Sequence, residues 1–152
     1  MKYFLLMASV LMMSCSGCMK DDKGCSNVKP ADEEAQILAY AAANGITATK
    51  HSSGMYYEVV NPGSGAKPTS SSVVSVKYTG KMLNGTQFDQ SLNPISFPLN
   101  GVIEGWTVGI PLIARGGKIK LIIPSSLAYG CNGRQPIPPN TVLYFDIELV
   151  NF

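Results

Sequence analysis

The sequence predicts an α+β fold in which strands with one apolar face each pack against a single short helix. Apolar residues occupy every second position over 119–123 and 143–149, a pattern typical of strands that bury one face. Glycines flank and punctuate the segment 105–112, which contains the only tryptophan, Trp106, and could form one short helix. A helix there would cover the apolar face of the strands. We therefore expect Trp106 either to pack in the core or to form the floor of a pocket.

Length and charge are those of one domain and give no indication of nucleic-acid binding. Of the 152 residues, a leader and a linker leave about 100, which is enough for one domain with a single core. The net charge is +2 and 14% of the residues are charged, without a run of lysines or arginines. Nucleic acid is therefore not an expected partner.

Residues 1–18 are predicted to be a signal peptide with a lipidation motif. Lys2 precedes an apolar run over 3–13, which is too short to span a bilayer but suits a secretory signal. Small residues before a cysteine resemble a bacterial lipobox, and both Cys15 and Cys18 fit it. Cys18 is favoured, because the Met-Lys-Asp-Asp that follows it resembles the surface-export signal of Bacteroidetes lipoproteins. The alternative is a plain signal peptide without lipid.

Residues 19–29 are polar and are predicted to form a flexible tether, since they cannot bury enough apolar surface to become ordered. Cys25 lies in this segment and Cys131 lies in a distant loop. If Cys18 becomes the mature N-terminus, these two are the only cysteines left, and an exported compartment would permit them to pair. The sequence leaves open whether they meet.

Residues 30–52 are predicted to be an N-terminal helix and a linker. The helix, over 30–44, has a proline at its start, acidic residues in its first turn and Asn44-Gly45 at its end. Its apolar stripe is narrow and consists of Ile37, Leu38 and Ala41. We expect this helix to dock loosely or to act as a spacer, and a role in dimerisation is less favoured. His51, the only histidine, has no Cys, Asp or Glu at metal-ligand spacing, so no metal site is predicted.

From residue 54 onward, apolar residues alternate with polar ones, which predicts strands. The predicted apolar faces are Met55, Tyr57 and Val59 in the first strand, and Val74, Val76 and Tyr78 in the second. A buried tyrosine usually finds a partner for its hydroxyl. Tyr78 is therefore either a core residue with a hydrogen-bonded hydroxyl or a pocket wall.

Four short motifs then follow in a fixed order. They are Tyr78-Thr79-Gly80, Phe88-Asp89, Val102-Ile103-Glu104-Gly105-Trp106 and Leu127-Ala128-Tyr129-Gly130. Taken alone, an aspartate such as Asp89 at a strand end is most often a turn-former. Together, the four motifs resemble those of FKBP-type peptidyl-prolyl cis-trans isomerases, and the resemblance covers the predicted isomerase domain, residues 53–152.

The resemblance implies an FKBP-like fold, in which an antiparallel sheet wraps around one short helix and a pocket lies between them. In the family, the position of Trp106 forms the floor of this pocket. The residues that match its lining positions are Tyr78, Phe88, Phe97, Val102, Ile103, Tyr129, Ile137 and Phe145. Three departures leave substrate preference and macrolide affinity open, and one of them is a link from Phe97 to Val102 that is shorter than in the best-known small members. Ile95 stands where the family often has an aromatic residue, and the loop after Tyr129 is altered at Cys131, Asn132 and Arg134.

The resemblance also implies an activity, rotation about X-Pro bonds of exported proteins during their folding. The barrier of roughly 18–20 kcal/mol comes from amide resonance, so the reaction needs no nucleophile, metal or cofactor. An apolar, water-poor pocket favours the twisted amide over the planar one. The family pattern assigns the backbone N–H of Ile103 and the hydroxyl of Tyr129 to substrate carbonyls. Asp89 is expected to orient the substrate or act electrostatically at the pocket edge, and Tyr78 is the third predicted catalytic residue.

Two other functions compete with the enzyme. One is a chaperone or peptide-binding module with weak or no turnover, and the other is a non-catalytic surface interaction protein with the same fold. An inactive relative would be expected to lose Asp89, Trp106 or Tyr129, and all three are present. The predicted partners are proline-containing peptides and unfolded exported proteins, with macrolide immunosuppressants as candidate ligands. The predicted location is the cell envelope, lipid-anchored to the outer membrane and facing the periplasm or the surface.

Overall fold

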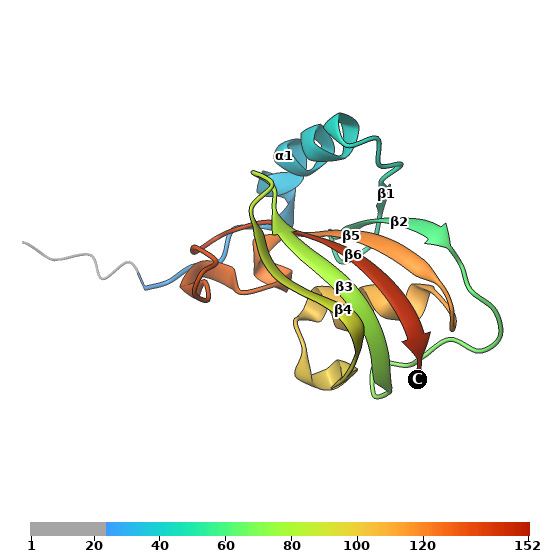
Figure 1. Ribbon diagram of the computed structural model, residues 1–152. Helices are drawn as coiled ribbons and strands as arrows, with labels where there is room; N and C mark the ends of the chain where they lie inside the picture. Colours follow the sequence, from blue (N-terminus) through green and yellow to red (C-terminus); the bar gives the residue numbers. More distant parts are fainter. Residues whose placement is uncertain (1–23) are drawn as a thin grey trace, which may run out of the picture.

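The structure, a computed structural model, describes residues 24–152. Its centre is a six-stranded sheet in the order β1-β2-β5-β6-β3-β4, in which every pair of neighbours is antiparallel (Figure 1). The strands are β1 (Thr49–Lys50), β2 (Tyr56–Asn61), β3 (Val73–Met82), β4 (Gln87–Pro98), β5 (Lys118–Ile123) and β6 (Leu143–Asn151). The predicted signal peptide, both candidate lipidation cysteines and the first part of the predicted tether lie outside the described residues.

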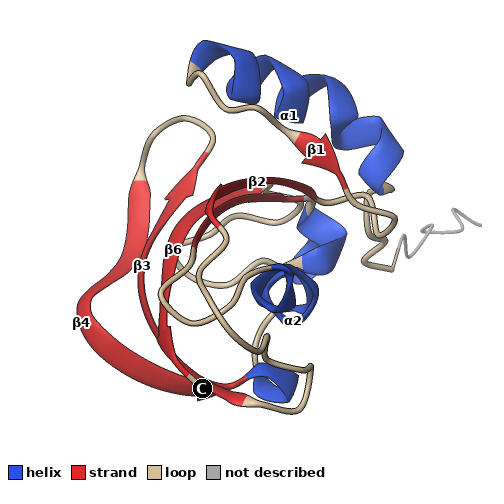
Figure 2. Ribbon diagram, turned by 90° about the vertical axis from the view of Figure 1, so that its right-hand side faces the viewer, coloured by secondary structure: helices blue, strands red, loops and turns tan. Residues whose placement is uncertain are grey.

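The helix α2 (Glu104–Gly109) lies in the hollow of the curved sheet and continues as a 3-10 turn over Ile110–Leu112 (Figure 2). This confirms the short helix predicted over 105–112. A Cβ on Gly105 would lie 2.5 Å from the Ile123 side chain, and one on Gly109 would lie 2.7 Å from Leu121. Because both positions lack a side chain, the helix backbone can rest directly on β5.

The main core lies between α2 and the face of the sheet that curves around it. The alternation predicted for three strands is confirmed, because each residue of the three sets is at most 9% exposed. These residues are Val74, Val76 and Tyr78 of β3, Ile119, Leu121 and Ile123 of β5, and Leu143, Phe145, Ile147 and Leu149 of β6. The predicted fold class, an antiparallel sheet around one short helix, is therefore confirmed.

The strand β2 departs from its predicted pattern. Met55, just before it, and Tyr57 pack in or against the main core as predicted. Val59 is 37% exposed, so its predicted place on the buried face is wrong. It lies at the register irregularity between Val59 and Asn61, where the strand leaves regular pairing with β5. Tyr56, only 4% exposed, is buried on the opposite face of the sheet.

The helix α1 (Pro30–Ala43) accounts for this second buried face. Ile37 is fully buried and Ala41 is 3% exposed, and both pack in a second core with Tyr56 and Ile122. The expected loose docking is therefore wrong, since full burial of one isoleucine contributes roughly 1.5–3 kcal/mol. The sheet offers the helix an apolar outer face that the alternation pattern does not predict. Leu38, the third residue of the predicted stripe, is 44% exposed.

The linker after α1 is part of the sheet. Within it, β1 pairs with β2, and the Lys50 ammonium lies 3.0 Å from the Glu34 carboxylate of α1. Tyr56 also donates a hydrogen bond to Glu34. The sheet thus begins at Thr49, before residue 53, where the predicted isomerase domain starts. Among residues 24–152, no helix is long and apolar enough to cross a membrane.

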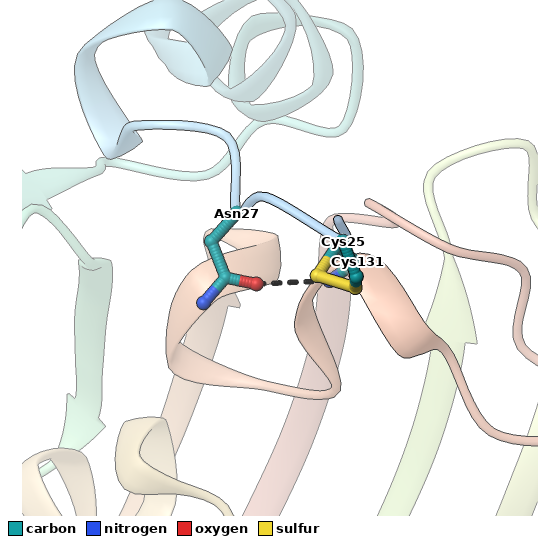
Figure 3. Close-up of a disulfide and its surroundings, with 3 residues drawn as sticks. All are labelled: Cys25, Asn27 and Cys131. Atoms are coloured by element: carbon teal, nitrogen blue, oxygen red, sulfur yellow. Dashed lines mark hydrogen bonds between the residues drawn. A yellow bond between two sulfur atoms is a disulfide. The ribbon is translucent and has the colours of Figure 1, made fainter. Parts of the chain in front are cut away.

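Residues 24–29 form no regular element but are attached to the rest of the protein. Cys25 forms a disulfide with Cys131, with a Cα–Cα distance of 5.5 Å (Figure 3). Asn27 accepts a hydrogen bond from the backbone N–H of Cys131 at 2.9 Å. The cysteine pair that the sequence left open is therefore present. The described part of the predicted tether is fixed at these points by a covalent bond and a hydrogen bond, neither of which requires apolar burial.

Candidate active site

A cavity of about 550 Å³ opens between α2 and the strands β3, β4 and β6. This volume is in the range of sites that bind small molecules or short peptide segments. Of the ten residues predicted for the site, nine line it. They are Tyr78, Phe88, Asp89, Phe97, Val102, Ile103, Trp106, Tyr129 and Phe145.

The floor of the cavity is built from Trp106, which is 4% exposed. Its ring meets three aromatic rings edge-on, with centroid distances of 5.0 Å to Tyr78, 5.3 Å to Phe145 and 5.8 Å to Phe97. Such T-shaped pairs fix ring orientation more firmly than burial alone. The indole Nε1 is buried and has no hydrogen-bond partner among the described residues. The floor is therefore rigid and presents apolar ring surface to the cavity.

Two neighbouring strands place a polar pair at one wall. Tyr78 of β3 donates a hydrogen bond from its hydroxyl to Asp89 of β4 at 2.7 Å. Two causes raise the pKa of Tyr78 above its ordinary value: mainly burial, and in addition the hydrogen bond to the Asp89 carboxylate. The hydroxyl therefore stays protonated and remains a donor. Asp89 is exposed and lies within the strand, paired with Gly80, so it is not the turn-former that the local sequence favours. The hydroxyl of Tyr78 is bonded, while its ring forms part of the pocket wall.

Glycine at position 80 makes room for the aromatic wall. A Cβ at Gly80 would lie 2.8 Å from ring atoms of both Phe88 and Phe145. The two rings themselves meet at a centroid distance of 5.6 Å and nearly at right angles. The Tyr-Thr-Gly motif thus supplies both a wall residue and the space next to it.

The segment that enters α2 forms another wall. Ile103 is the N-cap of the helix, and its carbonyl accepts a hydrogen bond from Trp106 N at 3.0 Å. The hydroxyl of Thr107 donates to the Leu99 carbonyl at 2.6 Å, which holds the segment from its other side. Val102 and Ile103 are partly buried against the main core. Their position follows from helix capping and one side-chain bond, and both residues line the cavity.

The loop after β5 carries Tyr129 and a neighbour that the site prediction missed. Arg134 lines the same cavity and donates a hydrogen bond from Nη1 to the Tyr129 hydroxyl oxygen at 3.4 Å. Its guanidinium also lies 5.5 Å from the centre of the Tyr129 ring, within cation–π range. Because the Tyr129 oxygen accepts from Arg134, its own hydrogen is left to point elsewhere. The altered loop sequence was the only signal that could have drawn attention to Arg134.

One predicted lining residue, Ile137, does not line the cavity. It is 6% exposed and belongs to the main core. Its backbone pairs with that of Arg134, whose N–H donates to the Ile137 carbonyl at 2.9 Å. The side chain of Ile137 therefore packs in the core and its backbone holds the loop, while the side chain of Arg134 reaches the cavity. The other lining residues that the prediction lacks are Gly101, Glu104 and Ala128, each adjacent to a predicted one.

The chemistry of these residues suits binding of an apolar group beside polar anchors. The described residues contain no group of three or more His, Cys, Asp or Glu side chains arranged to hold a metal ion. Six of the thirteen lining residues are aromatic, and the polar groups at the cavity are the Tyr129 hydroxyl, Asp89, Glu104 and Arg134. A proline ring is an apolar group of suitable size for such a floor. The carbonyls of a bound peptide on either side of its proline would then lie near the polar groups at the cavity edge and could accept hydrogen bonds there.

Comparison with protein families gives a match over most of the sheet and the whole cavity. The family model described as FKBP-type peptidyl-prolyl cis-trans isomerase matches residues 64–150. The FKBP-type peptidyl-prolyl cis-trans isomerase FkpA of Aeromonas hydrophila is 44% identical to this chain over 133 residues, which cover 86% of this chain and 48% of that protein. The chain spans about half the length of the curated relatives that it matches first.

Two solved structures support the same relationship. The crystal structure of FkpA from Escherichia coli superimposes with a TM-score of 0.71 at 44% identity, covering 80% of this chain and 60% of that one. A peptidyl-prolyl cis-trans isomerase from Pseudomonas syringae superimposes with a TM-score of 0.69 at 34% identity. In the second case the alignment covers 84% of this chain and 98% of the other.

Proposed function

Since this chain belongs to the FKBP-type peptidyl-prolyl cis-trans isomerase family, we propose that it catalyses cis-trans isomerisation of X-Pro bonds in exported proteins and so assists their folding. The observation that carries the proposal is the cavity with Trp106 as its floor and the Tyr78–Asp89 pair at its wall. Uncatalysed isomerisation takes tens to hundreds of seconds at 25 °C, slow enough to limit folding.

The proposed catalysis depends on the difference between the planar and the twisted amide. Rotation removes the resonance that gives the C–N bond its double-bond character, and the carbonyl becomes less polar at the transition state. An apolar floor that excludes water therefore favours the twisted form, and each 1.36 kcal/mol of difference is about tenfold in rate. The proline ring would lie on Trp106, whose ring is held by three edge-on contacts.

Polar groups at the rim would hold the peptide while the bond turns. We assign the hydroxyl of Tyr129 and the backbone N–H of Ile103 to substrate carbonyls on the two sides of the proline. The bond from Arg134 to the Tyr129 oxygen leaves the hydroxyl hydrogen free to be donated. Asp89 would act electrostatically near the rotating amide, with Tyr78 fixing its carboxylate through the 2.7 Å hydrogen bond.

A direct assay tests this function. The full chain should accelerate cis-trans exchange in a series of X-Pro peptides, followed by NMR exchange or by coupled proteolysis. Asp89→Ala and Tyr129→Phe should each lower kcat/KM while the circular dichroism spectrum and the urea midpoint stay close to those of the wild type. Peptide binding without any acceleration would support the alternative of a chaperone or peptide-binding module. Acceleration that both substitutions leave unchanged would contradict the assigned residue roles.

We further propose that the protein is lipid-anchored in the cell envelope. The support is the lipobox at Cys15 and Cys18, together with the Cys25–Cys131 disulfide, since such bonds persist mainly in exported proteins. Labelled palmitate should enter the wild type and be absent from the double variant Cys15→Ser/Cys18→Ser. Label retained in Cys18→Ser alone would place the anchor at Cys15. Label retained in the double variant would contradict anchoring at either cysteine.

A further inference from the structure

The loop that carries Tyr129 is attached to a segment from the far N-terminal end of the described chain. We call residues 124–134 the rim loop and residues 24–33 the N-terminal clamp. The rim loop leaves β5 and passes Tyr129 before it reaches Arg134 at the cavity mouth. Loops of this kind are ordinarily more mobile than the strands they connect. The clamp contacts the rim loop on both sides of Tyr129.

The first attachment lies four residues before Tyr129 in sequence. Glu33 of α1 is 2% exposed, and its Oε2 accepts a hydrogen bond from Ser125 N at 2.8 Å. Ser125 is fully buried and begins the 3-10 turn Ser125–Leu127. A buried polar group is costly unless it is hydrogen-bonded, so this bond contributes to the stability of the contact. Glu33 therefore fixes the entry to the rim loop.

The second and third attachments both reach Cys131, two residues after Tyr129 (Figure 3). Cys25 holds it through the disulfide, and the Oδ1 of Asn27 accepts from its backbone N–H at 2.9 Å. Gly130 lies between Tyr129 and Cys131, and its φ of +57° places it in the left-handed region. The Asn27 side-chain oxygen occupies the space that a Cβ of Gly130 would need. Asn27 and the rim loop thus fit together only because this position is glycine.

We propose that the N-terminal clamp positions Tyr129, with Cys25, Asn27 and Glu33 as the positioning residues. The inference rests on the proposed function, in which the Tyr129 hydroxyl binds a substrate carbonyl. Tyr129 belongs to a short run of irregular backbone fixed by Glu33 at one end and by Cys25 and Asn27 at the other. The disulfide joins residues 106 positions apart. It therefore attaches the rim loop covalently to a segment distant in the sequence, and it stabilises the fold mainly by restricting the unfolded chain.

The clamp makes the site sensitive to reduction. Cys25 is exposed and Cys131 is partly exposed, so a small thiol reductant can reach the bond. Each sulfur then gains a hydrogen, and the reductant becomes the new disulfide. The two hydrogen bonds between the clamp and the rim loop remain after this change, from Ser125 to Glu33 and from Cys131 to Asn27. The loop also keeps its backbone bonds to Ile137 and Asn140. Reduction is thus expected to loosen Tyr129 without unfolding the protein, and to lower activity without abolishing it.

The test compares removal of each attachment with a conservative variant that keeps it. In the full chain, Cys25→Ser/Cys131→Ser, Asn27→Ala and Glu33→Leu should each lower kcat/KM on X-Pro peptides about three- to tenfold, because small misplacements of binding groups are costly. Asn27→Asp and Glu33→Gln retain an oxygen acceptor and should stay within about twofold of the wild type. A reductant should lower the wild type to the level of the double cysteine variant and leave that variant unchanged.

A second set of measurements separates positioning of Tyr129 from a general loss of stability. In a Tyr129→Phe background the same clamp variants should change kcat/KM by less than about twofold, because residues that act through one group are not additive. Equal losses in both backgrounds, or no loss in the wild-type background, would overturn the proposal.

A third readout does not require turnover. With tyrosine rings labelled for NMR, the resonance of Tyr129 should shift or broaden on reduction, while that of Tyr56 stays in place. An unchanged Tyr129 resonance would overturn the positioning role. If the wild type shows no turnover, only the proposed function is contradicted. The spectroscopic comparison still decides whether the clamp positions Tyr129.

Discussion

Replacing Trp106 tests how the cavity floor contributes to both stability and function. Truncation of a large buried aromatic to alanine typically costs 3–5 kcal/mol of unfolding free energy. Trp106 is 4% exposed and forms T-shaped pairs with three rings, each of which adds about 0.5–1.5 kcal/mol beyond area burial. We therefore expect Trp106→Ala to fall at the upper end of this range, about 4–5 kcal/mol. Activity should fall with it, because the surface under the proline ring is removed.

Trp106→Phe is the matched control, and it should be far milder. It keeps an aromatic floor and removes the indole N–H, which is buried and has no partner among the described residues. An unsatisfied buried donor costs about 1–3 kcal/mol, so its removal should offset much of the lost ring area. The expected cost is about 1 kcal/mol or less, with kcat/KM reduced about threefold at most.

The measurement is urea unfolding followed by far-ultraviolet circular dichroism. Tryptophan fluorescence is unsuitable, because Trp106 is the only tryptophan and both variants lack it. A cost below about 1 kcal/mol for Trp106→Ala would refute the assigned burial of the ring. If Trp106→Phe lowers the free energy of unfolding as much as Trp106→Ala does, the indole N–H makes a favourable interaction, for example with a buried water.

Three further predictions follow from other parts of the cavity. Gly80→Ala is expected to lower kcat/KM about tenfold, mainly through KM in peptide titrations, because a Cβ placed 2.8 Å from ring atoms of Phe88 and Phe145 would push both rings into the cavity. Above about pH 10 the free energy of unfolding should fall, because burial and then a carboxylate hydrogen bond raise the pKa of Tyr78 above that of an unfolded tyrosine. Urea midpoints should fall less steeply with pH in Tyr78→Phe. Arg134→Met keeps the apolar stem, and it should lower kcat/KM for Glu-Pro relative to Leu-Pro peptides about fivefold, because the lost guanidinium lines the cavity.

Each of these has a result that would contradict it. Wild-type KM in Gly80→Ala would show that the rings can yield away from the cavity. A parallel loss of stability above pH 10 in wild type and Tyr78→Phe would assign the loss to other titrating groups. For Arg134→Met, the measured quantity is the ratio of kcat/KM for Glu-Pro peptides to that for Leu-Pro peptides. If this ratio is unchanged at low ionic strength, the side chain before proline does not lie near the guanidinium.

The sequence predicts the main core because alternation is a short-range pattern, whereas the expected cavity residues come from the resemblance to the family. Alternation marks the inward faces of β3, β5 and β6, since side chains on a strand point to one face at every second position. The four motifs contain seven of the nine predicted residues that line the cavity, all but Phe97 and Phe145. Alternation fails where two faces are covered at once. Around Tyr56 and Ile122 consecutive residues are buried on opposite sides, one in each core.

Loop conformation explains the errors at the cavity rim. Ile137 and Arg134 are paired through their backbones, yet the isoleucine faces the core and the arginine faces the cavity. Which of the two reaches the cavity depends on the path of the chain between them. Such a path follows from turn geometry and long-range contacts, which a linear pattern of apolar and polar residues does not encode.

The N-terminal clamp lies outside the residues that the family model matches. The matched residues are 64–150 and contain every residue that lines the cavity, whereas the N-terminal clamp ends at Glu33. A fragment that began at the predicted boundary, residue 53, would keep the cavity and lose α1. It would expose the outer face formed by Tyr56 and Ile122, and it would release the rim loop on both sides of Tyr129. The helix covers the second face of the sheet, and the helix together with the segment before it is attached to the loop that forms one wall of the cavity.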